Sequence, residues 1–187
     1  MMIKVCGITR REDALVAAEA GASAIGFIFY PKSPRWITPD RAATLGEGLD
    51  VWKVGVFVDE SPVTIESVMR AAGLDVAQTY GGAVPGKARV WRAFRVADSF
   101  DRSLSDGAEA VLLDGPTNGV SFDWALARGA AAKVIVAGGL DASNVAEAIR
   151  IAKPWGVDAS SKLETAPGVK DHDKVRAFVK AAREATW

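Results

Sequence analysis

Cysteine, histidine and long apolar runs are scarce in this 187-residue sequence, and each scarcity excludes a class of protein or site. The chain has one cysteine, Cys6, and one histidine, His172. A single cysteine excludes an internal disulfide and a metal site made of several thiolates. A single histidine argues further against zinc chemistry, which usually draws on several histidine or cysteine ligands. We therefore expect a cofactor-poor protein without a metal site.

No apolar run comes near the roughly 20 residues that a membrane-spanning helix needs. The first residues, MMIKVCGITRRED, reach charged side chains too early for a secretory signal. Lys plus Arg and Asp plus Glu both number 23. The resulting zero net charge gives no support for nucleic acid or an anionic membrane as a partner. We expect a soluble, cytoplasmic protein in which a local site would have to hold any anionic ligand.

The composition is that of an ordinary globular domain. Apolar residues make up 49% of the chain and charged residues 25%, which suits a sizeable core and argues against disorder. No linker, low-complexity tract or charge run divides the sequence. We therefore expect residues 1–187 to form a single domain.

Eight short runs rich in Val, Ile, Leu and Phe recur along the chain, and most of them end in Gly, Asp, Ser or Thr. Such runs are typical of strands that are buried on both faces. We expect strands at residues 3–9, 24–30, 52–59, 74–81, 89–96, 108–115, 133–140 and 156–161.

Helical patterns lie between most of these strands. Thr38 and Ser61 are candidate helix caps, each followed by a proline, and Gly21 and Gly73 are candidate helix stops. The stretch 81–88, GGAVPGKA, is too rich in glycine and proline for a regular helix.

Alternating strands and helices predict a parallel sheet. Eight strands fit a single, compact (β/α)8 TIM barrel with a shortened or missing helix after strand four. An open doubly wound sheet is the alternative, although KVCGITRRED lacks the glycine-rich turn that usually follows the first strand of that fold.

Cys6 and Asp114 are the candidate catalytic residues. In a (β/α)8 barrel the active site lies at the carboxyl ends of the strands. Cys6 falls near the end of the first predicted strand and Asp114 at the end of the sixth. Across one barrel mouth, one group could remove a proton from a small substrate while the other supplies one. On the residues alone, a buried structural thiol and a turn aspartate remain open alternatives.

An ordered set of motifs carries a resemblance to a known family. The motifs run from Lys4 to about Phe178 and are KVCGITRREDA, GFIFYPKSPRWI, VGVFVDES, LLDG, FDW, AGGLDASNV and VDASSKLETAPGVKDHDKV. Together they resemble phosphoribosylanthranilate isomerase. The resemblance implies a (β/α)8 barrel that works without metal or organic cofactor in tryptophan biosynthesis. The implied reaction is the Amadori rearrangement of N-(5-phosphoribosyl)anthranilate to 1-(2-carboxyphenylamino)-1-deoxyribulose 5-phosphate.

By this resemblance Cys6 matches the general base and Asp114 the general acid. The acid would protonate the furanose ring oxygen, so that the ring opens to a protonated Schiff base. The thiolate would then remove the C2 hydrogen, giving an enolamine that tautomerises to the ketose. These roles require a lowered pKa for Cys6 and a raised pKa for Asp114.

The implied substrate is a small phosphorylated molecule, and its phosphate needs backbone N–H donors. Barrel enzymes often bind phosphate in the loops after the seventh and eighth strands. In this sequence those loops contain Gly138 and Gly139, and Ser160 and Ser161. A tight turn is the alternative role for the two glycines.

The other end of the substrate carries a carboxylate. By resemblance Arg35 matches the arginine that grips it, a task that suits the bidentate geometry of a guanidinium. Asp158 could bind a sugar hydroxyl or make a structural hydrogen bond. We expect the protein to be a monomer or a homodimer.

Three places depart from the family pattern. Tyr80 stands where the fourth strand usually ends in Gln-Leu-His-Gly, and it can still form a hydrogen bond. Lys162 replaces the glycine of Ser-Ser-Gly, where it could hinder backbone approach to the phosphate or add a positive charge. The glycine-rich stretch before FDW is reduced to NGVS, at 118–121.

Two other functions compete with the isomerase. The analogous sugar isomerase of histidine biosynthesis is also a phosphate-binding barrel, but it uses an aspartate where this chain has Cys6. Activity on both aminoaldose substrates remains an open alternative. A phosphate-binding barrel without catalysis is the alternative from another class, and the presence of both Cys6 and Asp114 argues against it.

Overall fold

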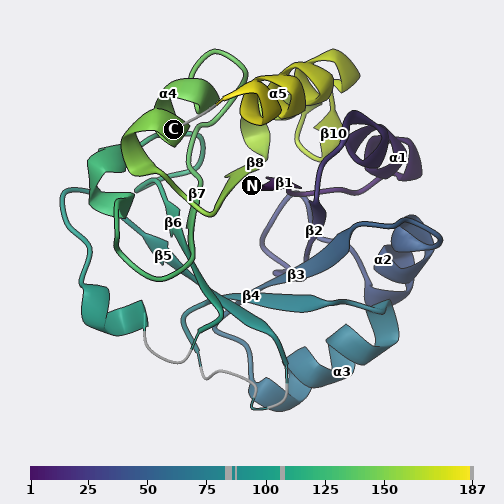
Figure 1. Cartoon of the computed structure of the whole chain (residues 1–187). Helices are drawn as coiled ribbons and strands as arrows, with labels where there is room; N and C mark the ends of the chain where they lie inside the picture. The colour runs from purple at the N-terminus through teal and green to yellow at the C-terminus, as the bar shows by residue number, and fades with distance from the viewer. Residues whose placement is uncertain (83–85, 87, 106–107, 186–187) are drawn as a thin grey trace.

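Eight parallel strands close into a barrel in the computed structural model, which describes residues 1–82, 86, 88–105 and 108–185 (Figure 1). The strands are β1 (Met2–Val5), β2 (Ala24–Ile28), β3 (Trp52–Val58), β4 (Val76–Tyr80), β5 (Val90–Arg95), β6 (Ala110–Asp114), β7 (Val134–Val136) and β8 (Gly156–Ala159). The last strand pairs with the first, with Met2 opposite Gly156 and Val5 opposite Ala159. The ring is complete, so the predicted (β/α)8 barrel is confirmed and the open-sheet alternative is wrong.

The α-helices of the described residues pack around the outside of the strands and are α1 (Arg11–Ala20), α2 (Pro39–Gly46), α3 (Pro62–Ala72), α4 (Val145–Ala152) and α5 (His172–Glu184). Their ends follow the signals in the sequence. The side chains of Thr38 and Ser61 accept backbone hydrogen bonds at the starts of α2 and α3. Gly21 and Gly73 adopt left-handed backbone conformations at the ends of α1 and α3, as glycine C-caps do.

Helical cover is reduced on one side of the barrel. In the described part of the chain, β5 follows β4 with no helix between them, and residues 83–85 and 87 of the predicted turn lie outside the description. After β5 and β6 the helices found among the described residues are the 3₁₀ helices η1 (Arg102–Ser105) and η2 (Trp124–Ala127). These reductions explain how a (β/α)8 barrel fits into a chain shorter than is typical.

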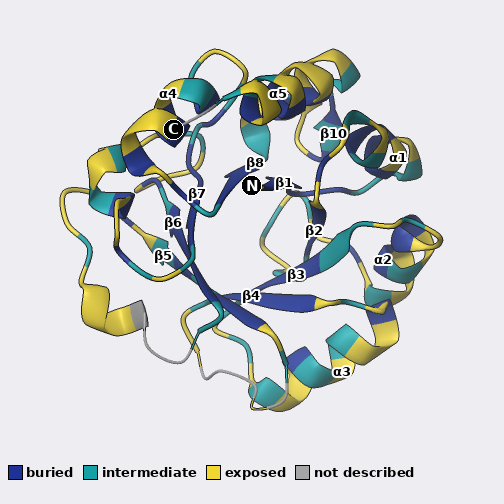
Figure 2. Ribbon diagram, viewed as in Figure 1, coloured by how far each residue is buried: buried dark blue, intermediate teal, exposed yellow. Residues whose placement is uncertain are grey.

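Apolar side chains fill both the space beneath the helices and the barrel interior. In Figure 2 most of the strand residues are dark blue, whereas the outward faces of the helices are largely yellow. Trp91 is fully buried near the amino-terminal ends of the strands, with its ring centroid 6.0 Å from that of Trp52 and 5.8 Å from that of Trp155. This aromatic cluster fills that end of the barrel, because large aromatic rings bury much apolar area.

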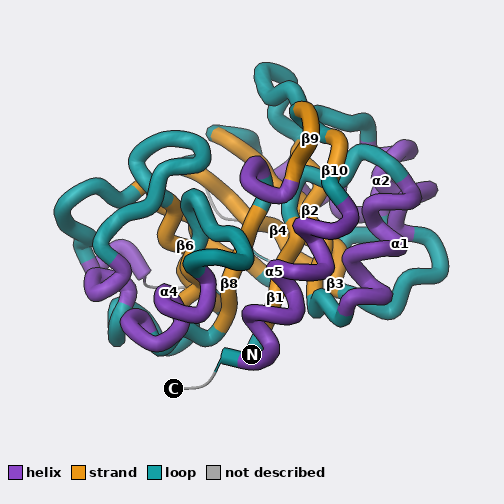
Figure 3. Tube along the Cα trace, turned by 90° about the horizontal axis from the view of Figure 1, so that it is seen from above, coloured by secondary structure: helices purple, strands orange, loops and turns teal. Residues whose placement is uncertain are grey.

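A small hairpin follows the barrel at its opposite end. After β8 come the 3₁₀ helix η3 (Ser161–Leu163) and the antiparallel strands β9 (Glu164–Ala166) and β10 (Val169–Lys170). Figure 3 shows the hairpin far from both chain ends, on the side toward which the barrel strands run. Across the described residues, no helix combines the length and apolar character needed to span a membrane.

Candidate active site

A cavity of about 450 Å³ opens at the carboxyl ends of the barrel strands. All eight residues that the sequence analysis selected line it: Cys6, Arg35, Asp114, Gly138, Gly139, Asp158, Ser160 and Ser161. Closure of the barrel therefore brings residues from both ends of the chain to one place. The volume is that of a site for a small molecule.

The Cys6 thiol lies in the buried wall of this cavity. Cys6 directly follows β1 and is only 6% exposed. Lys4, two residues earlier in the strand, is fully buried and donates a hydrogen bond from Nζ to Asp158 Oδ2 at 2.9 Å. A Cβ added to Gly26 of β2 would lie 2.7 Å from Cys6 Sγ and 3.1 Å from Lys4 Cε. The bare backbone at Gly26 thus makes room for both side chains.

Burial raises the pKa of the Cys6 thiol, and the nearby Asp158 carboxylate acts in the same direction, whereas the Lys4 ammonium opposes both. Burial also acts to lower the pKa of Lys4, but the attraction of Asp158 and Cys6 outweighs it, so this pKa is raised and Lys4 stays charged. The pKa of Cys6 is therefore raised overall, whereas a general base requires a lowered pKa. Two buried positive charges favour the thiolate, with the larger effect from Lys4 and a smaller one from Lys170.

The Asp114 carboxyl ends β6 on the far side of the ring from β1. Its Oδ2 accepts a hydrogen bond from Tyr80 Oη at 3.0 Å and lies 3.3 Å from Arg95 Nη1. Burial raises the pKa of Asp114, and the Arg95 charge and the Tyr80 hydrogen bond reduce this increase without cancelling it. A raised pKa is what the role of general acid requires.

Gly138 and Gly139 bring the loop after β7 against the loop after β6. Their φ values are +82° and +65°, and a Cβ at Gly138 would lie 2.4 Å from the Gly115 nitrogen. A Cβ at Gly139 would lie 2.7 Å from the Gly119 carbonyl oxygen. Close packing of two loops therefore requires glycine at both positions, whatever ligand they face.

The residues after β8 complete the same side of the cavity. Ser160 and Ser161 lie at the start of η3, and the exposed side chain of Lys162 lines the cavity beside them. Asp158, the third residue of β8, uses Oδ2 for Lys4. Its Oδ1 is buried and has no hydrogen-bond partner among the described residues. This oxygen is positioned to accept a hydrogen bond from a ligand.

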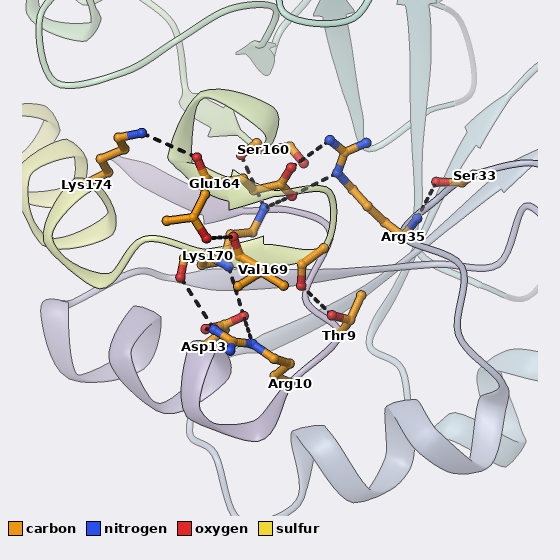
Figure 4. A network of polar contacts seen from close by, with 12 residues as sticks. Thr9, Arg10, Asp13, Ser33, Arg35, Ser160, Glu164, Val169, Lys170 and Lys174 are labelled. Carbon is orange, nitrogen blue, oxygen red and sulfur yellow. Dashed lines mark hydrogen bonds and ion pairs between the residues drawn. The ribbon is translucent and has the colours of Figure 1, made fainter.

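Arg35 belongs to a network of charges at the cavity edge (Figure 4). Its Nε and Nη2 donate to the two carboxylate oxygens of Glu164 at 2.8 and 2.7 Å. The Lys170 side chain is fully buried and donates from Nζ to Glu164 Oε1 at 2.7 Å and to the Ser160 carbonyl oxygen at 3.2 Å. The hairpin thus joins Arg35 to the loop after β8. One carboxylate between two cations leaves a net positive charge.

The other two members of this network, Glu164 and Lys170, have buried side chains. Burial acts to raise the pKa of Glu164, but the hydrogen bond from Arg35 and the charge of Lys170 outweigh it, so the pKa is lowered and Glu164 is ionised. Burial lowers the pKa of Lys170, and Glu164 opposes this. Arg35 is therefore held by a fixed carboxylate before any ligand carboxylate arrives.

Sequence reasoning missed several polar residues of this cavity and its supports: Lys4, Gln78, Arg95, Glu164 and Lys170. Gln78 is buried in β4, lines the cavity, and leaves its Oε1 without a partner among the described residues. Lys4 and Gln78 both interrupt an apolar strand pattern, which is a signal that could have found them. Glu164 and Lys170 carry no such signal, because they lie in an irregular polar segment.

The comparisons with known proteins agree with this geometry. Residues 3–181 match the family model for N-(5'phosphoribosyl)anthranilate (PRA) isomerase. The chain is 51% identical to N-(5'-phosphoribosyl)anthranilate isomerase from Solibacter usitatus (strain Ellin6076), over 99% of this chain and 98% of the relative. The structure is similar to phosphoribosyl anthranilate isomerase from Thermus thermophilus, with a TM-score of 0.93, 37% identity and 100% of both chains covered. It is also similar to a phosphoribosyl anthranilate isomerase in complex with reduced 1-(o-carboxyphenylamino)-1-deoxyribulose 5-phosphate, with a TM-score of 0.89, 37% identity and 98% of both chains covered.

Proposed function

Because the chain belongs to the N-(5'-phosphoribosyl)anthranilate isomerase family, we propose that Cys6 and Asp114 are the base and acid with which it performs that family's reaction. The protein is an isomerase of tryptophan biosynthesis. Its reaction is the Amadori rearrangement of N-(5-phosphoribosyl)anthranilate to 1-(2-carboxyphenylamino)-1-deoxyribulose 5-phosphate. The observation that carries the residue assignment is the position of Cys6 and Asp114 in the wall of one cavity.

Asp114 acts first in the proposed mechanism. Its carboxyl donates a proton to the furanose ring oxygen, and the bond between C1 and that oxygen breaks with both electrons going to the oxygen. The nitrogen lone pair then forms the protonated Schiff base. Burial, which raises the pKa of Asp114, keeps the carboxyl protonated at higher pH than an exposed aspartate.

Cys6 acts on the opened sugar. The Schiff base acidifies the C2 hydrogen, and the Cys6 thiolate removes it as a proton to give the enolamine, which tautomerises to the ketose. The positive charge of Lys4 acts to lower the pKa of Cys6 against the effect of burial. Lys4 therefore favours the thiolate form that the proton transfer needs.

The proposed phosphate site lies between the loops after β7 and β8. Gly138, Gly139, Ser160 and Ser161 line this part of the cavity, and Lys162 adds a positive charge beside them. Backbone N–H groups at bare glycines and serine hydroxyls are suitable donors for phosphate oxygens. Lys162 is thus proposed to support binding of the phosphate.

The proposed anthranilate site lies at Arg35. The guanidinium lies in the cavity wall with its side chain 13% exposed, and the Arg35, Glu164 and Lys170 group keeps a net positive charge that favours a ligand carboxylate. Asp158 Oδ1 is proposed to accept a hydrogen bond from a sugar hydroxyl, since a buried acceptor without a partner is costly.

Complementation of a tryptophan auxotroph that lacks this isomerase tests the function. Expression of the wild-type chain should restore growth without tryptophan, whereas the Cys6→Ser variant at matched expression should not. If wild-type protein that is soluble and folded fails to restore growth, the proposed activity is wrong.

The working form of the protein is a further part of the proposal. We propose that residues 1–187 act as one domain in the cytoplasm, as a monomer or a homodimer, on a small phosphorylated substrate. Sedimentation equilibrium of the purified chain distinguishes the two assembly states, and a higher oligomer would contradict both.

A further inference from the structure

Tyr80 approaches the proposed acid from two strands away in the barrel. Tyr80 ends β4 and Asp114 ends β6, with β5 between them. Side chains from alternate strands share a layer inside a (β/α)8 barrel, so these two side chains can meet in the mouth. The Tyr80 hydroxyl donates a hydrogen bond to Asp114 Oδ2 at 3.0 Å, and both residues line the cavity.

Arg95, which ends β5, reaches the same carboxylate oxygen. Its Nη1 lies 3.3 Å from Asp114 Oδ2, and its guanidinium lies 5.8 Å from the centroid of the Tyr80 ring. The guanidinium also donates to the Gly115 carbonyl oxygen at 3.2 Å and to Asn118 Oδ1 at 2.8 Å. Arg95 therefore fixes the start of the loop after β6, while Tyr80 holds the carboxyl from within the barrel.

We propose that Tyr80 is a positioning residue for the proton donor, whose hydroxyl orients the Asp114 carboxyl and stabilises the carboxylate left after proton transfer. The proposal rests on the function proposed above, because it concerns the acid step of that reaction. It assigns a role to Tyr80, which stands where the family pattern has a histidine.

The chemistry of a tyrosine suits this task. Burial raises the pKa of Tyr80 well above its usual value, and the negative charge of Asp114 raises it further. The hydroxyl therefore stays protonated and keeps the proton that it donates to Asp114. When Asp114 gives its proton to the ring oxygen, it becomes a carboxylate, and a hydrogen bond to a charged acceptor is stronger than one to a neutral acceptor. An interaction that strengthens along the reaction accelerates it.

The charged and titratable groups around Asp114 come from four strands. Tyr80 on β4, Arg95 on β5 and Lys4 on β1 each act to lower the pKa of Asp114 against the larger effect of burial. Asp158 on β8 also interacts with the Asp114 charge. Removal of the Tyr80 hydroxyl alone should therefore raise the pKa of Asp114, while the other groups stay in place.

Carbon-13 NMR titration of the aspartate carboxyl groups tests the proposal. The Asp114 signal is identified by its absence from the Asp114→Asn variant, and its pKa is then compared in wild type, Tyr80→Phe and Tyr30→Phe. Tyr30 is the matched control, because it is the other tyrosine of the chain and also lines the cavity. The pKa of Asp114 should rise in Tyr80→Phe and stay at its wild-type value in Tyr30→Phe.

Steady-state kinetics supply the second measurement. In Tyr80→Phe, kcat should fall roughly 10- to 100-fold, as expected for loss of one hydrogen bond to a charged group, with a much smaller change in KM. An unchanged pKa of Asp114, or a kcat within twofold of wild type, would overturn the proposal. If wild type binds ligand but never turns over substrate, the proposed function fails, whereas the NMR titration still decides whether Tyr80 controls Asp114.

Discussion

Lys4 and Asp158 are an ion pair almost without contact to solvent, with exposed side-chain fractions of 0% and 8%. Two buried charges lose their hydration, and their mutual attraction offsets that cost only while both are present. Lys4 also favours the thiolate of Cys6, because its positive charge acts to lower the pKa that burial raises. One lysine thus joins the first strand to the last and places a cation beside the proposed base.

Replacement of Lys4 alone should be strongly destabilising. In Lys4→Met the Asp158 carboxylate is left buried without its partner, which costs about 3–5 kcal/mol. The double variant Lys4→Met/Asp158→Asn carries no unpaired charge there and should recover part of that loss. Urea unfolding of the three proteins measures the free energies. A double variant that is as unstable as Lys4→Met would contradict the account of the pair.

At the scale of residues, the sequence predicted that Cys6 and Asp114, the proposed base and acid, would share the mouth of the barrel, but it did not predict their hydrogen-bond and ion-pair partners. Cys6 and Asp114 could be found because each follows an apolar run that predicts a strand, and strand ends form the mouth of a barrel. The contacts between Lys4 and Asp158 and between Tyr80 and Asp114 join segments far apart in the chain. Their pairing depends on strand register, which no local pattern reveals.

At the scale of elements, the β9–β10 hairpin holds the proposed carboxylate site. Glu164 begins the hairpin and Lys170 ends it, and both connect to Arg35 or to the loop after β8. Arg35 has an exposed side-chain fraction of 13% and Glu164 of 4%, so the bidentate ion pair between them is well shielded from water. The hairpin therefore fixes the direction in which the guanidinium faces the cavity.

Glu164→Gln should weaken substrate binding more than it slows the chemistry. The amide cannot hold the guanidinium in a bidentate ion pair, so we expect KM to rise roughly tenfold with a small change in kcat. Arg35→Ala should raise KM at least as much, because it removes the proposed contact itself. Glu184→Gln changes an exposed glutamate on α5 and serves as the matched control, with KM unchanged. An unaltered KM in Arg35→Ala would remove Arg35 from the site.

The elements themselves were predictable to different degrees. The predicted strands match in their interiors but run past the observed carboxyl ends, for example 133–140 against β7 at Val134–Val136. Small and apolar residues continue into the mouth loops, where they shape the cavity, so the composition of the sequence does not mark the end of the strand. The hairpin after β8 was not predicted, because its two strands are short and irregular.

At the scale of the whole molecule, the first and last units of the chain close the ring. Beyond the pairing of β1 with β8, the buried Asp13 of α1 binds Arg10 at 2.6 and 3.0 Å and the backbone N–H of Lys170 at 3.1 Å. Its Oδ1 also lies 2.9 Å from Nε2 of His172, the first residue of α5. The Asp13 carboxylate thus links α1 to the residues at the start of α5 through hydrogen bonds.

Asp13 should make the stability of the protein depend on pH. Burial acts to raise the pKa of Asp13, but the hydrogen bonds from Arg10, Lys170 and His172 outweigh it, so the folded-state pKa is lowered. A group of this kind stabilises the folded protein above its unfolded pKa of about 3.9, and this contribution is lost as the pH falls through the lower folded value.

Comparison of wild type with Asp13→Asn isolates this contribution. At pH 7 the variant should be less stable by about 2 kcal/mol, since it lacks hydrogen bonds to a charged group. The difference between the two free energies of unfolding should shrink as the pH is lowered below about 4. Urea titrations at a series of pH values measure it. A difference that stays constant or grows toward low pH would contradict this role for Asp13.

The overall architecture could be predicted because eight buried strands alternating with helices have few ways to pack. The reduced helical cover after β5 and β6 could not be predicted in the same way, because a 3₁₀ turn and a loop have no periodic sequence pattern. The contacts that close the ring, such as those of Asp13, depend on the final meeting of the chain's two ends. They follow from the closed architecture and not from any local segment.

The most direct test of the central claim measures kcat for Cys6→Ser and Asp114→Asn, together with binding of a reduced product analogue by calorimetry. If the thiol and the carboxyl act on one sugar as base and acid, each variant should lose about 100- to 10,000-fold in kcat. Each should still bind the analogue with an affinity near that of wild type. A variant that turns over substrate within a few-fold of the wild-type rate would show that its residue is not part of the proton transfer.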